Sequence, residues 1–320
     1  MSFSFGFSGD DYDEAESETA RLEQGHDADQ TVSLIPAQRH TLADLVAALP
    51  RTLAYSTLTL GGRLIPRREL WDIKHQLMSG DAAIADSAAE EAMAYMAKDD
   101  VIHGLYEGGF KTWECSLDLA EQVPGQLPAH AIELGCGTAL PTLCLLDAAL
   151  EQKYAMRLTV QDYNLSVLQL ATIPNLFLVW LRRQNPSAFE KEGEVQVSDE
   201  QVAQFQRGLS ALGIQVDGMT GAWSPAMLDL LQPVSPVCVL ASETIYAPSA
   251  LLAFLRLLQG LLEGGRGEGR IAAKHVYFGV GGGIRAFMEG CAGHGLVCES
   301  VYEVEQGVRR CVLLVRSTGA

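Results

Sequence analysis

A short glycine-containing segment is the first candidate for chemistry in this sequence. Gly135 and Gly137 follow the apolar run Ala129–Leu134 and precede a run with helical spacing that begins at Leu140. A strand, a glycine turn and a helix form a cradle in which a ligand can lie against the main chain, because glycine has no Cβ. A dinucleotide fingerprint needs a third glycine at position 140, but this position is Leu140 and Pro141 follows it. A pyrophosphate would therefore lack the close approach of the helix that it needs. The pattern favours a ligand with a ribose and an adenine but no pyrophosphate, which is S-adenosylmethionine, over a nicotinamide cofactor. A Gly-x-Gly alone is also typical of an ordinary strand-to-helix turn.

A carboxylate stands where the next apolar strand ends. Asp162 follows Val160 and Gln161. In a doubly wound sheet, ligands bind beyond the carboxyl ends of the strands, so this side chain can reach both hydroxyls of a ribose. The alternative is that Asp162 caps the following helix. Its distance of 25 residues from Gly137 favours the ligand role.

Two further strand ends carry polar, aromatic or glycine residues. Glu243 and Tyr246 follow the fourth strand, where they could flank an acceptor side chain. The fifth strand is followed by Tyr277 and by a loop with four glycines: Gly279, Gly281, Gly282 and Gly283. Such a loop has unusual backbone freedom and suits closure over a substrate, although a plain loop before a helix has the same composition.

The elements that must position these residues alternate between strand and helix. Helices are expected between the first six strands, and a helix over 116–122 precedes them. The strands are predicted at 130–134, 157–161, 214–218, 237–242, 269–274, 297–303 and 308–315. The last two are separated by so few residues that they must form an antiparallel hairpin. Five parallel strands followed by a hairpin predict an α/β, Rossmann-like fold with the seven-stranded sheet of class I methyltransferases.

The chain before this domain divides into two parts. Residues 1–35 are acidic and expected to be flexible. Residues 36–100 are predicted as an N-terminal extension that packs on the core, and residues 101–320 as the catalytic domain. The extension is predicted to contain a helix at 36–49, a strand at 53–58 with a turn at 61–62, a helix at 67–78 and an exposed helix or linker at 81–98. A polar segment at 184–200 is predicted as a surface insertion.

Composition excludes several classes of protein. The 320 residues are 48% hydrophobic with a net charge of −17, which argues against a nucleic-acid binder and suits a basic protein partner. The seven cysteines form no Cys-x-x-Cys pair and the histidines have no metal-ligand spacing, so we expect reduced thiols, no metal, and a cytosolic or nuclear monomer. The longest apolar run, Leu165–Leu181, contains Gln169, Pro174 and Asn175 and is predicted as a buried helix rather than a membrane span. No signal peptide is expected.

Six motifs together resemble a known family. They are Arg67–Met78, Tyr106–Cys115 (Tyr-Glu-Gly-Gly-Phe-Lys-Thr-Trp-Glu-Cys), Glu133–Gly137 (Glu-Leu-Gly-Cys-Gly), Gln161–Asn164 (Gln-Asp-Tyr-Asn), Ser242–Tyr246 (Ser-Glu-Thr-Ile-Tyr) and Tyr277–Gly283 (Tyr-Phe-Gly-Val-Gly-Gly-Gly). The chain resembles, over nearly its full length, the protein-histidine methyltransferases that modify a histidine of large-subunit ribosomal protein 3. That family belongs to a wider seven-strand group that includes many protein-lysine methyltransferases.

The resemblance implies roles for particular residues. It implies that Trp113 lies against S-adenosylmethionine, that Glu133, Gly135 and Gly137 hold its methionine end, and that Asp162 holds its ribose. Three more residues of these motifs and one outside them complete the predicted cofactor contacts: Cys136, Tyr163 and Ser242, and Trp223. Where the family commonly has Gly-Asp-Trp or Gly-Glu-Trp, this chain has Gly221-Ala222-Trp223, so an acidic contact near the adenine is missing while the indole can still stack.

The expected reaction is methyl transfer to an imidazole nitrogen of a ribosomal protein. A neutral imidazole has a free lone pair and needs no deprotonation, but its tautomer must be selected. We expect Glu243 or Asn164 to accept the far N–H, Tyr246 to pack on the ring, and Tyr277 with the following glycines to shape the substrate pocket. One alternative is a protein-lysine methyltransferase. Another is a cofactor-binding ribosome-assembly factor without catalytic activity.

Overall fold

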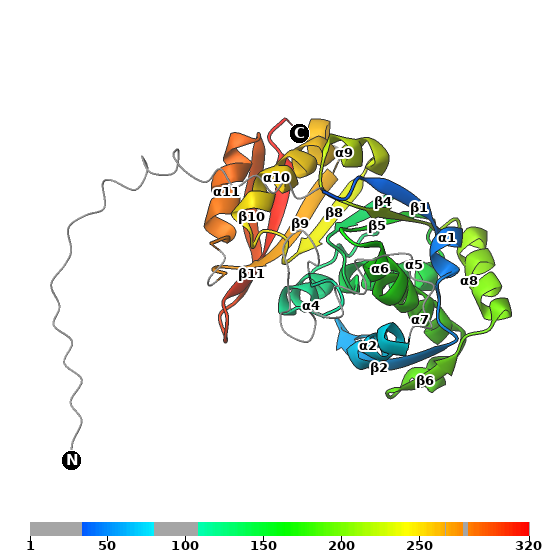
Figure 1. Cartoon of the computed structure of the whole chain (residues 1–320). Coiled ribbons are helices and arrows are strands. Elements are labelled where there is room, and N and C mark those ends of the chain that lie inside the picture. The colour runs from blue at the N-terminus through cyan, green and yellow to red at the C-terminus, as the bar shows by residue number, and fades with distance from the viewer. Residues whose placement is uncertain (1–33, 80–107, 266, 278–280, 320) are drawn as a thin grey trace, which may run out of the picture. The chain divides into compact units, whose positions relative to one another are not determined.

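The main sheet of the protein has eight strands. The computed structural model describes residues 34–79, 108–265, 267–277 and 281–319 (Figure 1). The strand order is β1-β7-β5-β4-β8-β9-β11-β10. All seven predicted strands are confirmed as β4 (His130–Leu134), β5 (Arg157–Asp162), β7 (Gln215–Thr220), β8 (Val237–Ser242), β9 (Gly267–Lys274), β10 (Leu296–Val304) and β11 (Arg310–Ser317). The first five are parallel, and β11 pairs antiparallel with both β9 and β10, as the short connection requires.

Some predicted features lie outside the described residues. They are the acidic segment up to residue 33, the 81–98 segment, the Tyr106-Glu107 pair and Gly279. Residues from Leu34 onward form one compact unit.

An eighth strand, β1 (Gln38–Thr41), adds to the edge of the sheet beside β7. The prediction of a helix over 36–49 was therefore wrong in its first half, and only α1 (Leu42–Val46) is helical. The Thr41 hydroxyl accepts the Asp44 main-chain N–H, and the Asp44 carboxylate accepts the Thr41 N–H in return. This reciprocal cap starts the helix only after the strand has ended.

A second, three-stranded sheet joins the extension to the predicted insertion. Its strands are β2 (Thr52–Leu60), β3 (Arg63–Arg68) and β6 (Gly193–Gln196), in the order β3-β2-β6. The 184–200 segment is thus not only a surface insertion, because β6 pairs antiparallel with β2. The predicted turn at Gly61-Gly62 is confirmed, and both glycines have positive φ. The helix predicted at 67–78 begins later, as α2 (Leu70–Ser79).

Buried ion pairs attach the small sheet to the main domain. The Asp147 carboxylate is fully buried on α5 (Leu140–Gln152) and pairs with Arg63 of β3 at 2.9 Å. It also contacts Arg182 and Arg183, both at 2.5 Å, at the end of α7 (Ile173–Gln184). Burial alone would raise the pKa of Asp147, but hydrogen bonds from these arginines lower it below the usual value. Removing one partner would leave a buried charge uncompensated, so the cluster fixes the small sheet in place.

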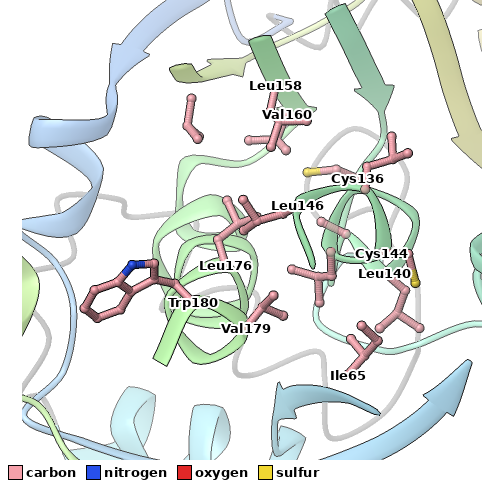
Figure 2. Close-up of a cluster of buried hydrophobic side chains, with 14 of the residues drawn as sticks. Ile65, Cys136, Leu140, Cys144, Leu146, Leu158, Val160, Leu176, Val179 and Trp180 are labelled. Carbon is pink, nitrogen blue, oxygen red and sulfur yellow. The ribbon is translucent and has the colours of Figure 1, made fainter. Parts of the chain in front are cut away.

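Helices cover both faces of the main sheet. α4 (Glu114–Glu121), α5 and α7 share one apolar cluster, and α9 (Pro225–Leu231), α10 (Pro248–Leu262) and α11 (Ile284–Gly293) share another. Figure 2 shows part of the first cluster, in which Leu158 and Val160 of β5 face Leu146 and Leu176 of the helices. Every residue of β4 is buried, including His130 and Glu133, so both faces of this strand are covered.

One helical stretch is long and apolar enough to cross a membrane. It is Leu165–Gln184, and 78% of its apolar window is buried inside the protein. Core helices pass the same test of length and composition. The stretch consists of α6 (Leu165–Val167), a π-helical turn η1 (Leu168–Thr172) and α7, so the predicted buried helix is confirmed.

Candidate active site

A cavity of about 330 Å³ opens where the central strands end. Its lining includes segments that follow β4, β5, β7 and β8 and a short stretch before α4. Ten residues predicted from the sequence line it: Trp113, Gly135, Cys136, Gly137, Asp162, Tyr163, Trp223, Ser242, Glu243 and Tyr246. The parallel strands therefore bring together motifs that lie up to 133 positions apart, as ligand sites at the carboxyl ends of strands require.

The loop after β4 has a conformation that requires glycine. Gly135 and Gly137 have φ values of +60° and +52°. A Cβ on Gly137 would lie 2.9 Å from the carbonyl oxygen of Gly109, and one on Gly135 would lie 3.0 Å from a methyl carbon of Thr244. Neither loop residue can carry a side chain without strain, so the main chain itself forms the floor of the cavity.

Asp162 belongs to this loop rather than to a helix cap. Its Oδ2 accepts the main-chain N–H of Gly137 at 2.9 Å, and its Oδ1 accepts that of Asn164 at 3.4 Å. The side chain is 4% exposed and lines the cavity. Asn164, not Asp162, is the N-cap residue of α6, and no side chain caps that helix. The alternative reading of Asp162 as an N-cap was wrong.

Gln161 is a site residue that the sequence analysis missed. Its Oε1 accepts N–H groups from Gly135 at 3.2 Å and from the Trp223 indole at 2.8 Å, and its Nε2 donates to the Gly221 carbonyl at 3.1 Å. One buried amide thus connects the loops after β4 and β7. The signals in the sequence are its place beside Asp162 at the end of a strand and its membership of the Gln161–Asn164 motif.

The N-terminal segment closes one end of the cavity. The Tyr163 hydroxyl accepts the Ile35 N–H at 3.3 Å, and the Ala222 N–H donates to the Ile35 carbonyl at 2.9 Å. Leu34 lines the cavity beside Trp223, whose ring packs against Phe254 with centroids 5.1 Å apart. Apolar groups and main chain therefore surround the position of the missing acidic residue.

A charged cluster occupies another part of the lining. Glu243 has φ +57° and a side chain that is 10% exposed, and its Oε1 lies 3.3 Å from Nζ of Lys274. The same ammonium lies 3.3 Å from the Glu114 carboxylate. Burial tends to lower the pKa of Lys274, but the two carboxylates raise it above the usual value, so this lysine is charged. The sequence analysis did not identify Lys274, because its two partners are distant in the chain.

The predicted substrate residues lie beside this cluster. The rings of Tyr246 and Tyr277 meet edge to face with centroids 6.3 Å apart. Burial and the neighbouring Glu243 raise the pKa of the Tyr277 phenol. Gly282 packs so closely that a Cβ would lie 2.1 Å from the Tyr246 carbonyl oxygen, and Gly283 has φ +158°. Tyr277 and the described glycines do not line the cavity; they support Tyr246, which does.

Two predicted site residues lie behind the lining. Glu133 is 1% exposed, and its Oε2 accepts the N–H of Thr142 at 2.9 Å and its hydroxyl at 2.5 Å. Burial raises the pKa of Glu133 to about 8. Asn164 is also buried. Of the predicted hydrogen-bond partners for an imidazole, Glu243 is the one on the cavity surface.

Within the described ranges, one group of residues has the composition of a metal site. His275, Glu303 and Cys311 have ligand atoms within 4.8 Å of one another. His275 Nε2 is already paired with Glu303 at 3.0 Å, and burial raises the pKa of the Cys311 thiol to about 12. The group lacks a ready thiolate ligand.

Comparison with known proteins identifies the family. No protein-family model matches the chain. Histidine protein methyltransferase 1 of Schizosaccharomyces pombe is 34% identical over 296 residues, which span 89% of this chain and 83% of the relative. The chain belongs to the histidine protein methyltransferase 1 family. Its Saccharomyces cerevisiae relative of the same name is 27% identical over the full length of both chains, and a Dictyostelium discoideum homologue is 32% identical over 197 residues, 60% of this chain and 51% of that relative.

Two solved methyltransferase structures are distantly similar to this chain. The mitomycin 7-O-methyltransferase MmcR has 14% identity and a TM-score of 0.39 over 78% of this chain and 60% of its own. A precorrin-6y C5,15-methyltransferase from Geobacter metallireducens has 12% identity and a TM-score of 0.36 over 63% and 87%. The class I methyltransferase fold of the present chain is assigned from the order β7-β5-β4-β8-β9-β11-β10 and its single antiparallel strand.

Proposed function

We propose that this protein is an S-adenosylmethionine-dependent methyltransferase that modifies an imidazole nitrogen of a histidine in another protein. The observation that carries the proposal is the placement of Glu243 on the same cavity as Asp162 and the glycine loop. A carboxylate that can accept an imidazole N–H thus shares a cavity with residues suited to a nucleoside. Membership of the histidine protein methyltransferase 1 family supports the same activity.

The residues present fit S-adenosylmethionine. Gly135 and Gly137 line the cavity with main chain, so a ligand can lie against the backbone of this loop. Asp162 would bind ribose hydroxyls, and the Trp223 ring and Leu34 would hold the adenine. The described lining has no cluster of cations for phosphates, which this cofactor does not need. When bound, the cofactor supplies a methyl group on a sulfonium, and the imidazole lone pair forms the new N–C bond as the C–S bond breaks.

The protein residues act on the acceptor ring. Glu243 accepts the N–H of the distal ring nitrogen, which leaves the lone pair on the other nitrogen free to attack. The ring becomes positively charged during transfer, and the same carboxylate stabilises that charge. Tyr246, held by Tyr277 and Gly282, packs beside the ring. Solvent takes the proton after the product leaves.

The substrate that we propose is a histidine of large-subunit ribosomal protein 3. The motif resemblance supports this substrate, and the net charge of −17 suits a basic ribosomal protein. We also propose that the protein acts as a monomer in the cytoplasm or the nucleus.

Mass spectrometry of ribosomal proteins from cells with and without this protein tests the proposal. We expect one methyl-histidine in ribosomal protein 3 to disappear in its absence and to return with the wild-type gene but not with Glu243→Gln. Calorimetry with S-adenosylmethionine, followed by a transfer assay, separates the alternatives. Binding without transfer would indicate an assembly factor, methyl-lysine would indicate a lysine methyltransferase, and unchanged methyl-histidine would overturn the substrate.

A further inference from the structure

Lys274 contacts every part of the charged cluster beside the cavity. Its Nζ lies 3.3 Å from both Glu243 and Glu114. It also lies 5.4 Å from the Trp113 ring centroid and 6.0 Å from that of Tyr277. The side chain is only 17% exposed, so the contact with Glu243 is shielded from solvent.

This ammonium is the cation that faces Glu243. Around Glu243, the Cys115 thiol on α4 and the Tyr277 phenol are neutral, because burial raises the pKa of each. Arg310 is engaged with Asp118 at 2.6 Å. Lys111 lies over the same Trp113 ring that Lys274 approaches, with its Nζ 4.7 Å from the ring centroid. Within the described residues, the ion pair that Glu243 forms is the one with Lys274.

The charge of Glu243 decides whether it can select a tautomer. An ionised carboxylate only accepts hydrogen bonds, so it holds an imidazole by its N–H and leaves the opposite lone pair free. A protonated carboxyl group could instead donate to that lone pair and block attack. A nearby opposite charge favours the ionised form, whereas burial disfavours it.

We propose that Lys274 is a positioning residue that pairs with the Glu243 carboxylate and holds it oriented toward the acceptor imidazole. The catalytic role of Lys274 rests on the proposed function. The effect of Lys274 on the Glu243 carboxylate does not, because it can be observed in the protein alone. Glu114 has the secondary task of holding the far side of the ammonium. Lys274 itself touches neither reacting atom.

A double-mutant cycle tests the catalytic part. We expect Lys274→Met to lower kcat for a histidine peptide by about 10-fold when Glu243 is present and by less than about 2-fold in the Glu243→Gln background. Lys274→Arg should restore most of the activity, because it keeps the charge. Arg285→Met, which breaks an ion pair on the exposed face of α11, is the matched control and should leave kcat unchanged. Independent, multiplicative effects of the Lys274 and Glu243 changes would overturn the proposal.

A spectrum without substrate or cofactor tests the contact itself. In protein labelled with 13C at glutamate carboxyls, the signal lost in Glu243→Gln belongs to Glu243. Its chemical shift at pH 7 should change in Lys274→Met and return toward the wild-type value in Lys274→Arg, because the ammonium lies 3.3 Å from the carboxylate. An unchanged chemical shift in Lys274→Met would overturn the proposal even if the enzyme methylates histidine. Absence of methyl-histidine with wild-type protein would instead overturn the proposed function and leave this spectrum to decide the role of Lys274.

Discussion

Asp162 Oδ2 lies 2.9 Å from the main-chain nitrogen of Gly137 and accepts its hydrogen bond. The contact joins the end of β5 to the glycine loop after β4, so one carboxylate both shapes the loop and faces the cavity. The conformation of the glycine loop and the position of Asp162, the residue proposed to bind the ribose, therefore depend on each other.

Two substitutions of Asp162 should weaken cofactor binding to different extents. Asp162→Asn keeps an oxygen for the Gly137 N–H but loses the charge, and we expect about 10-fold weaker binding of S-adenosylmethionine by calorimetry. Asp162→Ala loses both the oxygen and the charge, and we expect about 100-fold weaker binding of S-adenosylmethionine, since hydrogen bonds to charged groups contribute about 1.5–3 kcal/mol. The exposed Asp229→Ala is the control. Wild-type affinity in Asp162→Ala would contradict the assigned role.

Gln161→Ala should lower both stability and cofactor affinity. The Gly135 N–H, the Trp223 indole N–H and the Gly221 carbonyl would all lose their partner. Each buried group left unsatisfied costs about 1–3 kcal/mol, so urea denaturation should show at least that loss. Gln206→Ala, on α8 (Asp199–Ala211) away from this cavity, is the comparison. Equal stability of the two variants would mean that the amide does not connect the loops.

Gly282→Ala should impair the protein more than Gly125→Ala. A Cβ at Gly282 would lie 2.1 Å from the Tyr246 carbonyl oxygen, whereas nothing lies within 4 Å of one at Gly125. Overpacking of this kind costs about 1–3 kcal/mol and would displace Tyr246. We expect a lower melting temperature and a higher KM for the histidine peptide in Gly282→Ala. Similar peptide kinetics in both alanine variants would show that Tyr246 does not depend on this glycine.

The buried carboxyl group of Glu133 should make the free energy of unfolding fall as the pH rises from about 4.5 to about 8. Burial raises its pKa to about 8 from the model-peptide value of 4.5, so the folded protein holds a proton that the unfolded chain releases between these values. The stability that this proton provides is complete below pH 4.5 and is lost as pH rises through about 8. The loss should reach about 5 kcal/mol once the pH exceeds 8, by the conversion of 1.36 kcal/mol for each pKa unit between 4.5 and about 8.

Urea denaturation of wild type and Glu133→Gln from pH 5 to pH 9 checks this linkage. The free energy of unfolding of wild type should fall relative to that of Glu133→Gln as pH rises, because glutamine cannot ionise. The exposed Glu305→Gln should follow the wild type. Parallel curves for wild type and Glu133→Gln would mean that Glu133 does not titrate in this range.

The sequence predicts the central strands well because each has apolar residues at its buried positions and is followed by a turn or loop signal. β4 is buried on both faces, and the glycine turn after it marks its end. β1 is different: its residues are Gln-Arg-His-Thr, and pairing with β7 makes it a strand rather than any apolar pattern. The same is true of β6, which is a strand because β2 lies beside it.

The motifs of the site are predictable, but the contacts among its residues are not. Asp162 and Glu243 stand at strand ends, where a parallel sheet collects ligand residues. The partners of Glu243 depend on the left-handed backbone at that residue, φ +57°, and on the end of β9, which brings Lys274 beside it. Nothing near Gln161 in the sequence shows that its amide faces Trp223, 62 positions away.

The edge strand β1 and the small sheet have a consequence for synthesis of the chain. The Arg39 side chain of β1 donates a hydrogen bond to Asp217 of β7, 178 positions later, and the Thr52 hydroxyl of β2 donates one to Gln196 of β6, 144 positions later. At about 5–20 residues per second, the first strand waits roughly 10–35 seconds on the ribosome before its partner is made. β1 and the edge of β2 that faces β6 therefore stay unpaired long after they are translated. During that interval these exposed strand edges can pair with other chains unless they are covered.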